Sequence, residues 1–351
     1  MKSGLDLVAQ HLRLMPGKPH MNAISIMGPM QIALVHTPIP IPGDHEVLVK
    51  VKASGICGTD VHIARGEYLG AYPIVPGHEF SGTIESLGAK VTKFQVGDRV
   101  AIEPNVSCGH CQYCLNDIIN FCENWSAVGV TRPGGMAEYV CVPESAAFSS
   151  SDLAFETAAF MEPLSCILHG ATKLNFSKSP HVLIMGAGPI GLMFAQVCKF
   201  KGAQSVSILE KQETRLKLAE KVGTGEVFSD LSELEDNYFD CIIDATGAIA
   251  LMESSIRTIK KGGEVLFFGV PERGATLKID AFKFFEKGLS LYTSYTSVKN
   301  SQEALDLLRS GAVNVSTLIS HSLPLREFER SIKMLSEDHS ETLKIMLNPE
   351  L

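Results

Sequence analysis

Four cysteines crowd into one short stretch of the sequence: Cys108, Cys111, Cys114 and Cys122, spaced C-x2-C-x2-C-x7-C. Four thiolates complete the tetrahedral shell of a zinc ion and leave no position for water or substrate. The spacing therefore predicts a structural zinc site that ties down a loop with no core of its own. An iron–sulfur cluster, whose ligand runs can be similarly spaced, and free thiols are the alternatives.

A second group of possible metal ligands is mixed in type and dispersed along the chain. Cys57 follows a predicted strand, His78 and Glu79 are adjacent, and Glu162 lies in the segment Met-Glu-Pro-Leu-Ser. Such a set leaves one coordination position open for water or an alcohol, as a Lewis-acid site requires. Taken singly, each residue is more often structural, because a cysteine after a strand is usually a small core residue. The prediction depends on the combination.

A glycine-rich turn opens the second half of the chain, between the predicted strand 181–185 and the predicted helix 192–200. Its G-x-G-x-x-G sequence is Gly186, Ala187, Gly188, Pro189, Ile190 and Gly191. In this context the glycines permit a tight turn, close approach of a pyrophosphate and close packing of helix on strand. The turn therefore predicts a dinucleotide site, and the alternative is a strand-to-helix turn that binds nothing.

Glu210 ends the next predicted strand, 22 residues beyond Gly188. A carboxylate there accepts hydrogen bonds from the adenosine ribose and repels a 2′-phosphate, which favours NAD over NADP. The basic side chains of Lys211 and Arg215 lie close by and weaken that preference. We include Arg215 among the expected cofactor-binding residues.

Two patterns of secondary structure must position these groups. Short Val/Ile strands broken by Gly and Pro, from Gln31 to about Val142, predict an all-β module. From Pro180 to about Tyr295, strands alternate with amphipathic helices, which predicts βαβ units and a parallel sheet. The expected parallel strands are 181–185, 205–210, 241–244 and 264–269. Three further residues then lie at the carboxyl edge of this sheet, where ligands bind, and we expect them to flank the nicotinamide: Thr246, Gly269 and Val270.

Length, composition and charge limit the possible functions. With 351 residues the chain is long enough for two domains, and a net charge of −8 without a Lys/Arg stripe argues against nucleic-acid binding. The longest apolar runs are of strand length, so we expect no membrane span. The crowded cysteines suit a reducing compartment, which predicts a cytoplasmic protein. Residues 1–21 lack a signal-peptide core, and we interpret them as a leader or tag-like extension.

The motifs together resemble those of the zinc-containing medium-chain alcohol and polyol dehydrogenases. The matching stretches are Gly-Ile-Cys-Gly-Thr-Asp-Val-His, Pro-Gly-His-Glu, Val-Gly-Asp-Arg-Val, the four cysteines, Glu-Pro-Leu-Ser and Gly-Ala-Gly-Pro-Ile-Gly, in the family's order from about residue 22 onward. The resemblance implies an α/β protein. We expect a GroES-like β-rich catalytic domain at 22–171 and 297–351, with a Rossmann doubly wound parallel-sheet domain inserted at 172–296 and the active site between them.

The resemblance also assigns roles to residues. It gives Cys57, His78 and Glu79 to a catalytic zinc, with Glu162 as a fourth ligand that can alternate with water. Ethanol-type members carry a cysteine in that place, so Glu162 indicates the sorbitol, threonine and butanediol dehydrogenase branch. Cys166, one helical turn later, is an alternative ligand.

Thr59 and His62 are similar to the hydroxyl–imidazole proton relay of threonine dehydrogenase-like members. Their alternative roles are a turn-stabilising hydroxyl and a surface histidine. We therefore predict an NAD-dependent enzyme with two zinc ions per chain that oxidises a secondary alcohol of a small polyol, polyol phosphate or diol. Family members form dimers or tetramers, so a homo-oligomer is expected.

The substrate is the least specified part of the prediction. Sorbitol-type members carry an arginine after the last strand, where this chain has only uncharged residues at 291–296, and no motif indicates an amino-acid carboxylate site. A phosphate would need a basic pocket, for which Arg65 and Arg132 are candidates. The alternative functions are an L-threonine 3-dehydrogenase-like enzyme and a non-catalytic cofactor-binding protein of the same fold.

Overall fold

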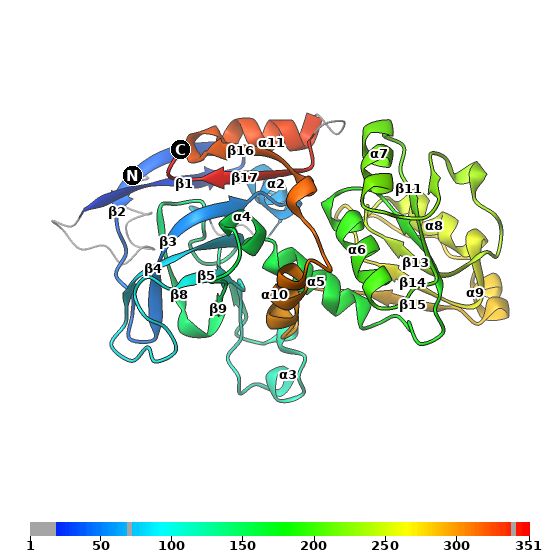
Figure 1. Ribbon diagram of the computed structural model, residues 1–351, viewed down its shortest axis with the longest axis horizontal. Coiled ribbons are helices and arrows are strands. Elements are labelled where there is room, and N and C mark those ends of the chain that lie inside the picture. The colour runs from blue at the N-terminus through cyan, green and yellow to red at the C-terminus, as the bar shows by residue number, and fades with distance from the viewer. Residues whose placement is uncertain (1–18, 69–71, 338–341) are drawn as a thin grey trace. The chain divides into compact units, whose positions relative to one another are not determined.

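The chain forms two compact units, and the computed structural model describes residues 19–68, 72–337 and 342–351 (Figure 1). The first unit runs to Pro163 and also contains Ser301–Arg309 and Val315–Leu351. The second unit comprises Leu164–Asn300 and Ser310–Asn314, so it interrupts the first in the sequence. The expected domain limits of 172 and 296 fall inside the second unit and stay a prediction. Most of the expected leader lies outside the described residues.

The first unit is built on a seven-stranded sheet. Six strands follow the order β16(Ile319–Pro324), β17(Lys344–Asn348), β3(Glu46–Gly55), β4(Glu79–Leu87), β5(Arg99–Ile102) and β9(Ala147–Ser149), while β8(Tyr139–Pro143) pairs with β3. All neighbours are antiparallel except β16 and β17. Val47, Val49 and Val51 alternate along β3 and pack in one core cluster with Phe80 and Ile84 of β4. The alternating apolar pattern therefore produces the expected β module.

A separate pair of antiparallel strands, β1(His20–Gly28) and β2(Gln31–Pro38), begins the described chain. β1 was not predicted from the sequence, because its first residues were assigned to the leader. Ile24 and Ile26 of β1 pack in a core cluster with Ile63 and Phe328. His20 and Met21 thus already belong to the folded first unit.

Helices and short connections complete the first unit. Its helices are α2(Gly58–Arg65), α3(Gln112–Leu115), α4(Phe155–Ala158), α10(Ser301–Ser310) and α11(Phe328–Glu337), and α5(Met161–Ala171) begins in it. One-turn helices are η1(Ile119–Phe121), η2(Glu144–Ala146), η4(Ser316–Leu318) and η5(Leu325–Glu327). The short strands β6(Asn105–Val106) and β7(Ser126–Ala127) pair with each other and flank the segment that contains the four clustered cysteines. Ile332 of α11 and Ile63 of α2 share a core cluster, which fixes α2 in place.

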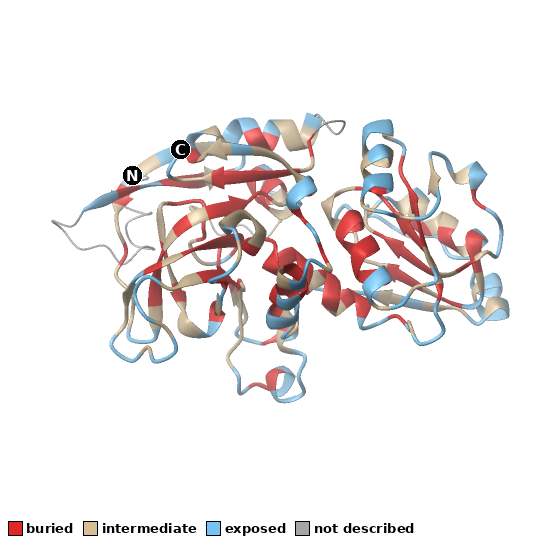
Figure 2. Cartoon of the chain, viewed as in Figure 1, coloured by how far each residue is buried: buried red, intermediate tan, exposed pale blue. Residues whose placement is uncertain are grey.

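The second unit contains a six-stranded, wholly parallel sheet. Its order is β12(Val227–Phe228), β11(Ser205–Leu209), β10(His181–Met185), β13(Phe239–Asp244), β14(Ile259–Phe267) and β15(Ser290–Thr293). Helices α6(Pro189–Phe200), α7(Glu213–Lys221), α8(Ile249–Thr258) and α9(Ala281–Lys287) and the turn η3(Leu231–Glu233) connect the strands. Figure 2 shows the central strands of this sheet as buried. The order is that of a Rossmann doubly wound sheet, as predicted.

Several strand limits differ from the prediction. β10 has the predicted bounds, but β14 begins at Ile259 and not at Glu264. Gly262 and Gly263 interrupt the apolar pattern there, and the register of β13 against β14 shifts before Cys241, so the local sequence does not look like a strand. The edge strand β15 was also missed, because its burial is only partial.

Candidate metal centres and dinucleotide site

Three predicted ligands of the catalytic metal lie together in the first unit. The ligand atoms of Cys57, His78 and Glu79 all lie within 4.8 Å of one another. Cys57 is the residue before α2, two residues beyond the end of β3, and Glu79 is the first residue of β4. Because Gly55, the last residue of β3, pairs with Glu79 across the sheet, the antiparallel register brings the two ligand segments together. His78 and Glu79 are only 5% and 1% exposed.

Asp60, which sequence analysis did not single out, connects the two segments. Its Oδ2 accepts a hydrogen bond from the Cys57 N–H at 2.9 Å, and its Oδ1 accepts one from the Gly77 N–H at 3.3 Å. His78 Nδ1 lies 3.4 Å from the same Oδ1, an ion-pair distance without hydrogen-bond geometry. Burial lowers the pKa of His78, but the neighbouring Asp60 and Cys57 raise it, and the net direction is upward. The sequence signal that could have identified Asp60 is its position as an acidic residue in the first turn of α2.

Glycines make room for the ligands. A Cβ at Gly55 would lie 2.6 Å from Glu79 Oε2, so only glycine leaves space for the carboxylate opposite it. Gly77, directly before His78, has a φ of +97°, and a Cβ there would lie 2.7 Å from Met136. These two glycines let the backbone approach closely on both sides of the ligand cluster.

Lys344 is the second residue that sequence analysis missed. It is buried, its Nζ lies 2.5 Å from Glu79 Oε2, and it donates a hydrogen bond to the Ile56 carbonyl at 3.2 Å. Burial lowers the pKa of Lys344, but the carboxylate of Glu79 and the thiolate of Cys57 raise it, and the net direction is upward. β17 pairs with β3 so that Met346 faces Gly55, which places Lys344 at the ligand cluster. A lone lysine at the start of an apolar strand was the only sequence signal.

The donor set fits zinc. A thiolate, an imidazole and a carboxylate are all zinc ligands, and three protein ligands are typical of a site that keeps a position open. Glu162 is nearly buried in the first turn of α5, and its charge raises the pKa of Lys344, so it lies near the cluster. It is not among the three residues whose ligand atoms lie within 4.8 Å of one another. Direct binding of zinc by Glu162 therefore stays a prediction.

The four cysteines form the second cluster, again with all ligand atoms within 4.8 Å. The Sγ atoms of Cys111 and Cys114 lie 3.5 Å apart, and those of Cys108 and Cys114 lie 4.0 Å apart. Tetrahedral zinc with Zn–S bonds of about 2.3 Å requires S–S separations of about 3.8 Å, so the thiols fit this ion. Backbone hydrogen bonds lower the pKa of Cys108 to about 6. Trp125 packs on the cluster and on the core of the first unit.

The predicted relay residues lie on α2. Thr59 and His62 are three residues apart and therefore neighbours on the helix surface, and both are partly exposed. His62 Nδ1 lies 2.7 Å from Glu67 Oε2, a contact that the sequence did not indicate. Their role in proton transfer stays a prediction.

The glycine-rich turn in the second unit has the backbone that a dinucleotide site needs. Gly186 has a φ of +103°, and a Cβ there would lie 2.7 Å from the Thr246 side chain. Gly188 directly precedes α6, whose first residue is Pro189, with Ile190 next. Gly191 packs against the Gly186 carbonyl too closely for any side chain. The helix N-terminus thus directs free N–H groups to the turn, as a pyrophosphate site requires.

Glu210 lies directly after β11, next to the turn. Its Oε2 accepts a hydrogen bond from the Ala187 N–H, and its Oε1 accepts one from the Gln212 N–H, each at 3.0 Å. Arg215 Nη1 lies 4.0 Å from Glu210 Oε2 and within reach of Gly188. These two hydrogen bonds fix the Glu210 carboxylate beside the glycine-rich turn.

The ends of β13 and β14 complete this edge of the sheet. Asp244 is fully buried, which raises the pKa of its carboxyl, and its oxygens accept hydrogen bonds from the N–H groups of Thr246 at 3.1 Å and Gly247 at 3.0 Å. A Cβ at Gly269 would lie 2.6 Å from the Thr246 backbone, and Val270 is exposed. The structure thus brings the predicted residues from the ends of four strands, β10, β11, β13 and β14, together in the second unit.

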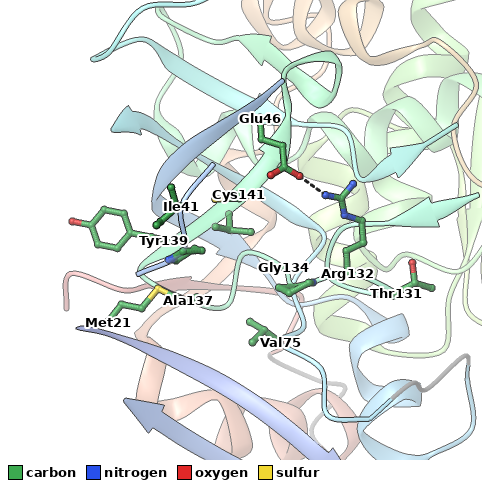
Figure 3. Close-up of a pocket in the computed structure, with 13 residues that line it drawn as sticks. Met21, Ile41, Glu46, Val75, Thr131, Arg132, Gly134, Ala137, Tyr139 and Cys141 are labelled. Carbon is green, nitrogen blue, oxygen red and sulfur yellow. Dashed lines mark hydrogen bonds and ion pairs between the residues drawn. The ribbon is translucent and has the colours of Figure 1, made fainter. Parts of the chain in front are cut away.

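A cavity of about 270 Å³ lies elsewhere in the first unit (Figure 3). Its walls include Met21, Val75 and Tyr139, and none of the metal ligands lines it. Arg132, one candidate for phosphate binding, points into this region but pairs with Glu46 at 2.7 Å. Because the only two charged side chains of the lining neutralise each other, the cavity offers no net charge to a phosphate.

Comparison with known proteins gives matches over both units. Residues 43–152 match the family model of the alcohol dehydrogenase GroES-like domain, and residues 189–310 match that of zinc-binding dehydrogenases. D-arabinitol dehydrogenase 1 of Uromyces fabae is 32% identical over 94% of this chain and 97% of its own. L-threonine 3-dehydrogenase of Shewanella pealeana is 34% identical over 93% of this chain and 99% of its own.

A solved structure shows the same similarity in three dimensions. A protein from Sinorhizobium meliloti 1021, described as a zinc-binding dehydrogenase bound to NADP, matches with a TM-score of 0.91. It is 32% identical, and the match covers 95% of this chain and 100% of that one. In the part of the chain that the structure describes, no helix is long and apolar enough to cross a membrane.

Proposed function

The chain belongs to the zinc-binding medium-chain alcohol dehydrogenase family, and from that premise we propose that it transfers hydride from a secondary alcohol of a small polyol to NAD. The observation that supports this proposal is the buried Cys57–His78–Glu79 cluster, a ligand set with an open position, in a chain that also carries a dinucleotide turn. Neither feature alone would indicate a dehydrogenase.

Family membership confirms several predictions. The GroES-like and Rossmann fold class, the zinc-dependent oxidoreductase activity on a small alcohol, and the use of zinc and a nicotinamide cofactor all stand. The number of zinc ions per chain, the site residues and the domain limits remain proposals. A non-catalytic protein of the same fold is not supported.

The residues of the chain would share the reaction as follows. Cys57, His78 and Glu79 would hold the zinc, which when bound acts as a Lewis acid and lowers the pKa of the substrate hydroxyl. Asp60 would keep the two ligand segments in register through its hydrogen bonds to the Cys57 and Gly77 N–H groups. Thr59 would accept the hydroxyl proton and pass its own proton to the next group on α2.

The second unit would bind the cofactor. The turn from Gly186 to Gly191 would bind the pyrophosphate, and Glu210 the adenosine ribose. Thr246, Gly269 and Val270 would flank the nicotinamide at the ends of β13 and β14. Because the carboxylate of Glu210 repels a 2′-phosphate, we infer a preference for NAD over NADP, although the similar protein of S. meliloti binds NADP.

A polyol is the first substrate that we infer, because three relatives are named as dehydrogenases of polyols, namely D-arabinitol, D-altritol and sorbitol. L-threonine is the second, because an equally similar relative is a threonine dehydrogenase. A panel of pentitols, hexitols, polyol phosphates, 2,3-butanediol and L-threonine, with NAD and NADP in parallel, tests both. NADH formation with a polyol supports the first proposal, and turnover of L-threonine alone would replace it with the second. Metal analysis of the same sample should give two zinc ions per chain, as the two ligand sets require.

We infer a homo-oligomer formed through the second unit. β15 is an edge strand of the parallel sheet, and on the preceding helix α9 the side chains of Phe282 and Phe285 are 71% and 81% exposed. Two phenylalanines left in water indicate a protein interface. Light scattering after gel filtration should give a dimer or tetramer, and a Phe282→Glu/Phe285→Glu variant should shift toward monomer. A monomeric wild type would contradict the inference.

We also infer a cytoplasmic location, which cell fractionation tests.

A further inference from the structure

His62 and Glu67 lie side by side where α2 ends. His62 Nδ1 and Glu67 Oε2 are 2.7 Å apart. The helix stops at Arg65, and Gly66 turns the chain with a φ of +80°, after which the Glu67 N–H donates to the His62 carbonyl at 2.9 Å. A Cβ at Gly66 would lie 2.8 Å from Pro29 Cγ, so this turn depends on glycine. The turn therefore folds Glu67 back onto the imidazole.

The contact adds little to stability. Both side chains are well exposed, at 41% for His62 and 50% for Glu67, and ion pairs in such positions are weak because water screens them. A carboxylate at this distance does, however, determine the tautomer and the orientation of the His62 imidazole. When Nδ1–H donates to the carboxylate, Nε2 is left as the proton acceptor and the ring orientation is fixed.

We propose that Glu67 is a positioning residue for His62 in the proton path that the proposed function places on Thr59 and the next group on α2. The proposal rests on the proposed function. The proton balance is simple: the substrate hydroxyl proton passes to Thr59 Oγ1 while the Thr59 proton passes to His62 Nε2. The C–H electron pair leaves as hydride to the nicotinamide. The imidazolium then returns one proton to water, which both exposed side chains contact.

A measurement without turnover tests the contact itself. ¹⁵N spectra of histidine-labelled protein report the protonated nitrogen of each ring, and a His62→Gln variant identifies the signal of His62. We expect the Nδ1–H form in the wild type and a mixture with the Nε2–H form in Glu67→Ala. Glu67→Asp keeps a carboxylate and should retain part of the preference for Nδ1–H. An unchanged tautomer in Glu67→Ala overturns the proposal, whatever the activity.

Kinetics test the consequence. Glu67→Ala should lower kcat roughly tenfold to hundredfold, as loss of a group that orients an active-site imidazole does, with KM and the Kd of NADH within about twofold of the wild type. Glu67→Asp should recover part of the rate. In a His62→Ala background, Glu67→Ala should have no further effect, because the two residues act as one unit. Glu329→Ala removes a matched exposed ion pair, with Lys333 on α11, and should leave kcat unchanged.

The outcomes separate this proposal from the proposed function. A Glu67→Ala enzyme with wild-type kcat, or an equal loss in the His62→Ala background, overturns the role of Glu67 while the dehydrogenase stands. Full activity of His62→Ala overturns the relay and with it the role of Glu67. If the wild type oxidises no alcohol, the proposed function fails, and the tautomer measurement still decides whether Glu67 controls His62.

Discussion

Replacing Lys344 by Met tests the electrostatics of the metal cluster. Methionine has a similar length and keeps the apolar stem, so the change removes the ammonium with little loss of packing. The Lys344–Glu79 pair is buried, with side chains 6% and 2% exposed and 2.5 Å between Nζ and Oε2. Removing one partner of a buried ion pair leaves the other charge uncompensated and costs about 3–5 kcal/mol of the free energy of unfolding.

The pH dependence of this loss follows from the raised pKa of Lys344. A lysine whose folded-state pKa exceeds its unfolded value near 10.5 contributes stability that is fully present below that value and is lost only as the pH rises through the folded pKa. Between pH 7 and pH 9, the loss in Lys344→Met should therefore stay constant. A loss that shrinks over this range would indicate that Lys344 is not charged in the folded protein.

Fluorescence of the single tryptophan provides the assay. Trp125 packs on the core of the first unit, so urea unfolding followed by its emission reports on that unit. With every variant measured in chelator-treated protein, so that loss of a zinc ligand does not add to the cost, a Glu79→Gln/Lys344→Met double variant removes both charges and should regain at least half of the lost stability. A loss below about 1 kcal/mol in the single variant, or additive losses in the double variant, would refute the reasoning.

Three further predictions follow from the two clusters and the cofactor turn. Cys57→Ser should abolish NADH formation with folding largely intact, while Cys111→Ser should mainly lower the urea midpoint, and equal loss of both properties in each variant would contradict two separate sites. Among the four clustered cysteines of chelator-treated protein near pH 7, iodoacetamide should modify Cys108 first and Cys114 last, because backbone hydrogen bonds lower the pKa of Cys108 to about 6 and burial raises that of Cys114 to about 11; equal labelling of the four by mass spectrometry would count against this. Glu210→Ala should raise kcat/KM for NADP relative to NAD by roughly tenfold, about 1.4 kcal/mol of repulsion removed, and an unchanged ratio would show that Glu210 does not select the cofactor.

Short motifs carried most of the site prediction. The four cysteines lie within 15 residues, and the Gly186–Gly191 turn directly joins one strand to one helix, so each geometry is set by local spacing. Cys57 and Glu79 were also predictable, because the short segments that contain them match the motifs of the family. The sheet of the second unit followed from alternation of strands and helices, apart from the weakly patterned edge strand β15.

Contacts between distant or turning segments could not be read from the sequence. Lys344 reaches the cluster only because β17 pairs with β3, and its hydrogen bond to Ile56 spans 288 residues. Glu67 is close in sequence to His62, but their contact depends on the left-handed turn at Gly66. Glu67 lies beyond the end of α2, so the helical spacing of residues does not indicate that it contacts His62. In both cases the residue type is common on protein surfaces, so only the fold distinguishes it.

The charges around the metal cluster explain why a buried cation from outside the ligand motifs is needed there. Cys57 as a thiolate, Glu79, the buried Asp60 and the nearby Glu162 would bring four negative charges into a largely buried space, and burying unpaired charge is strongly unfavourable. A divalent cation offsets two of them, and the buried ammonium of Lys344 offsets a third. A chain with the same motifs but a neutral residue at this position on β17 would have to keep one more anion uncompensated or protonated. The cation supplied by β17 is therefore part of what makes this mixed ligand set compatible with a buried site.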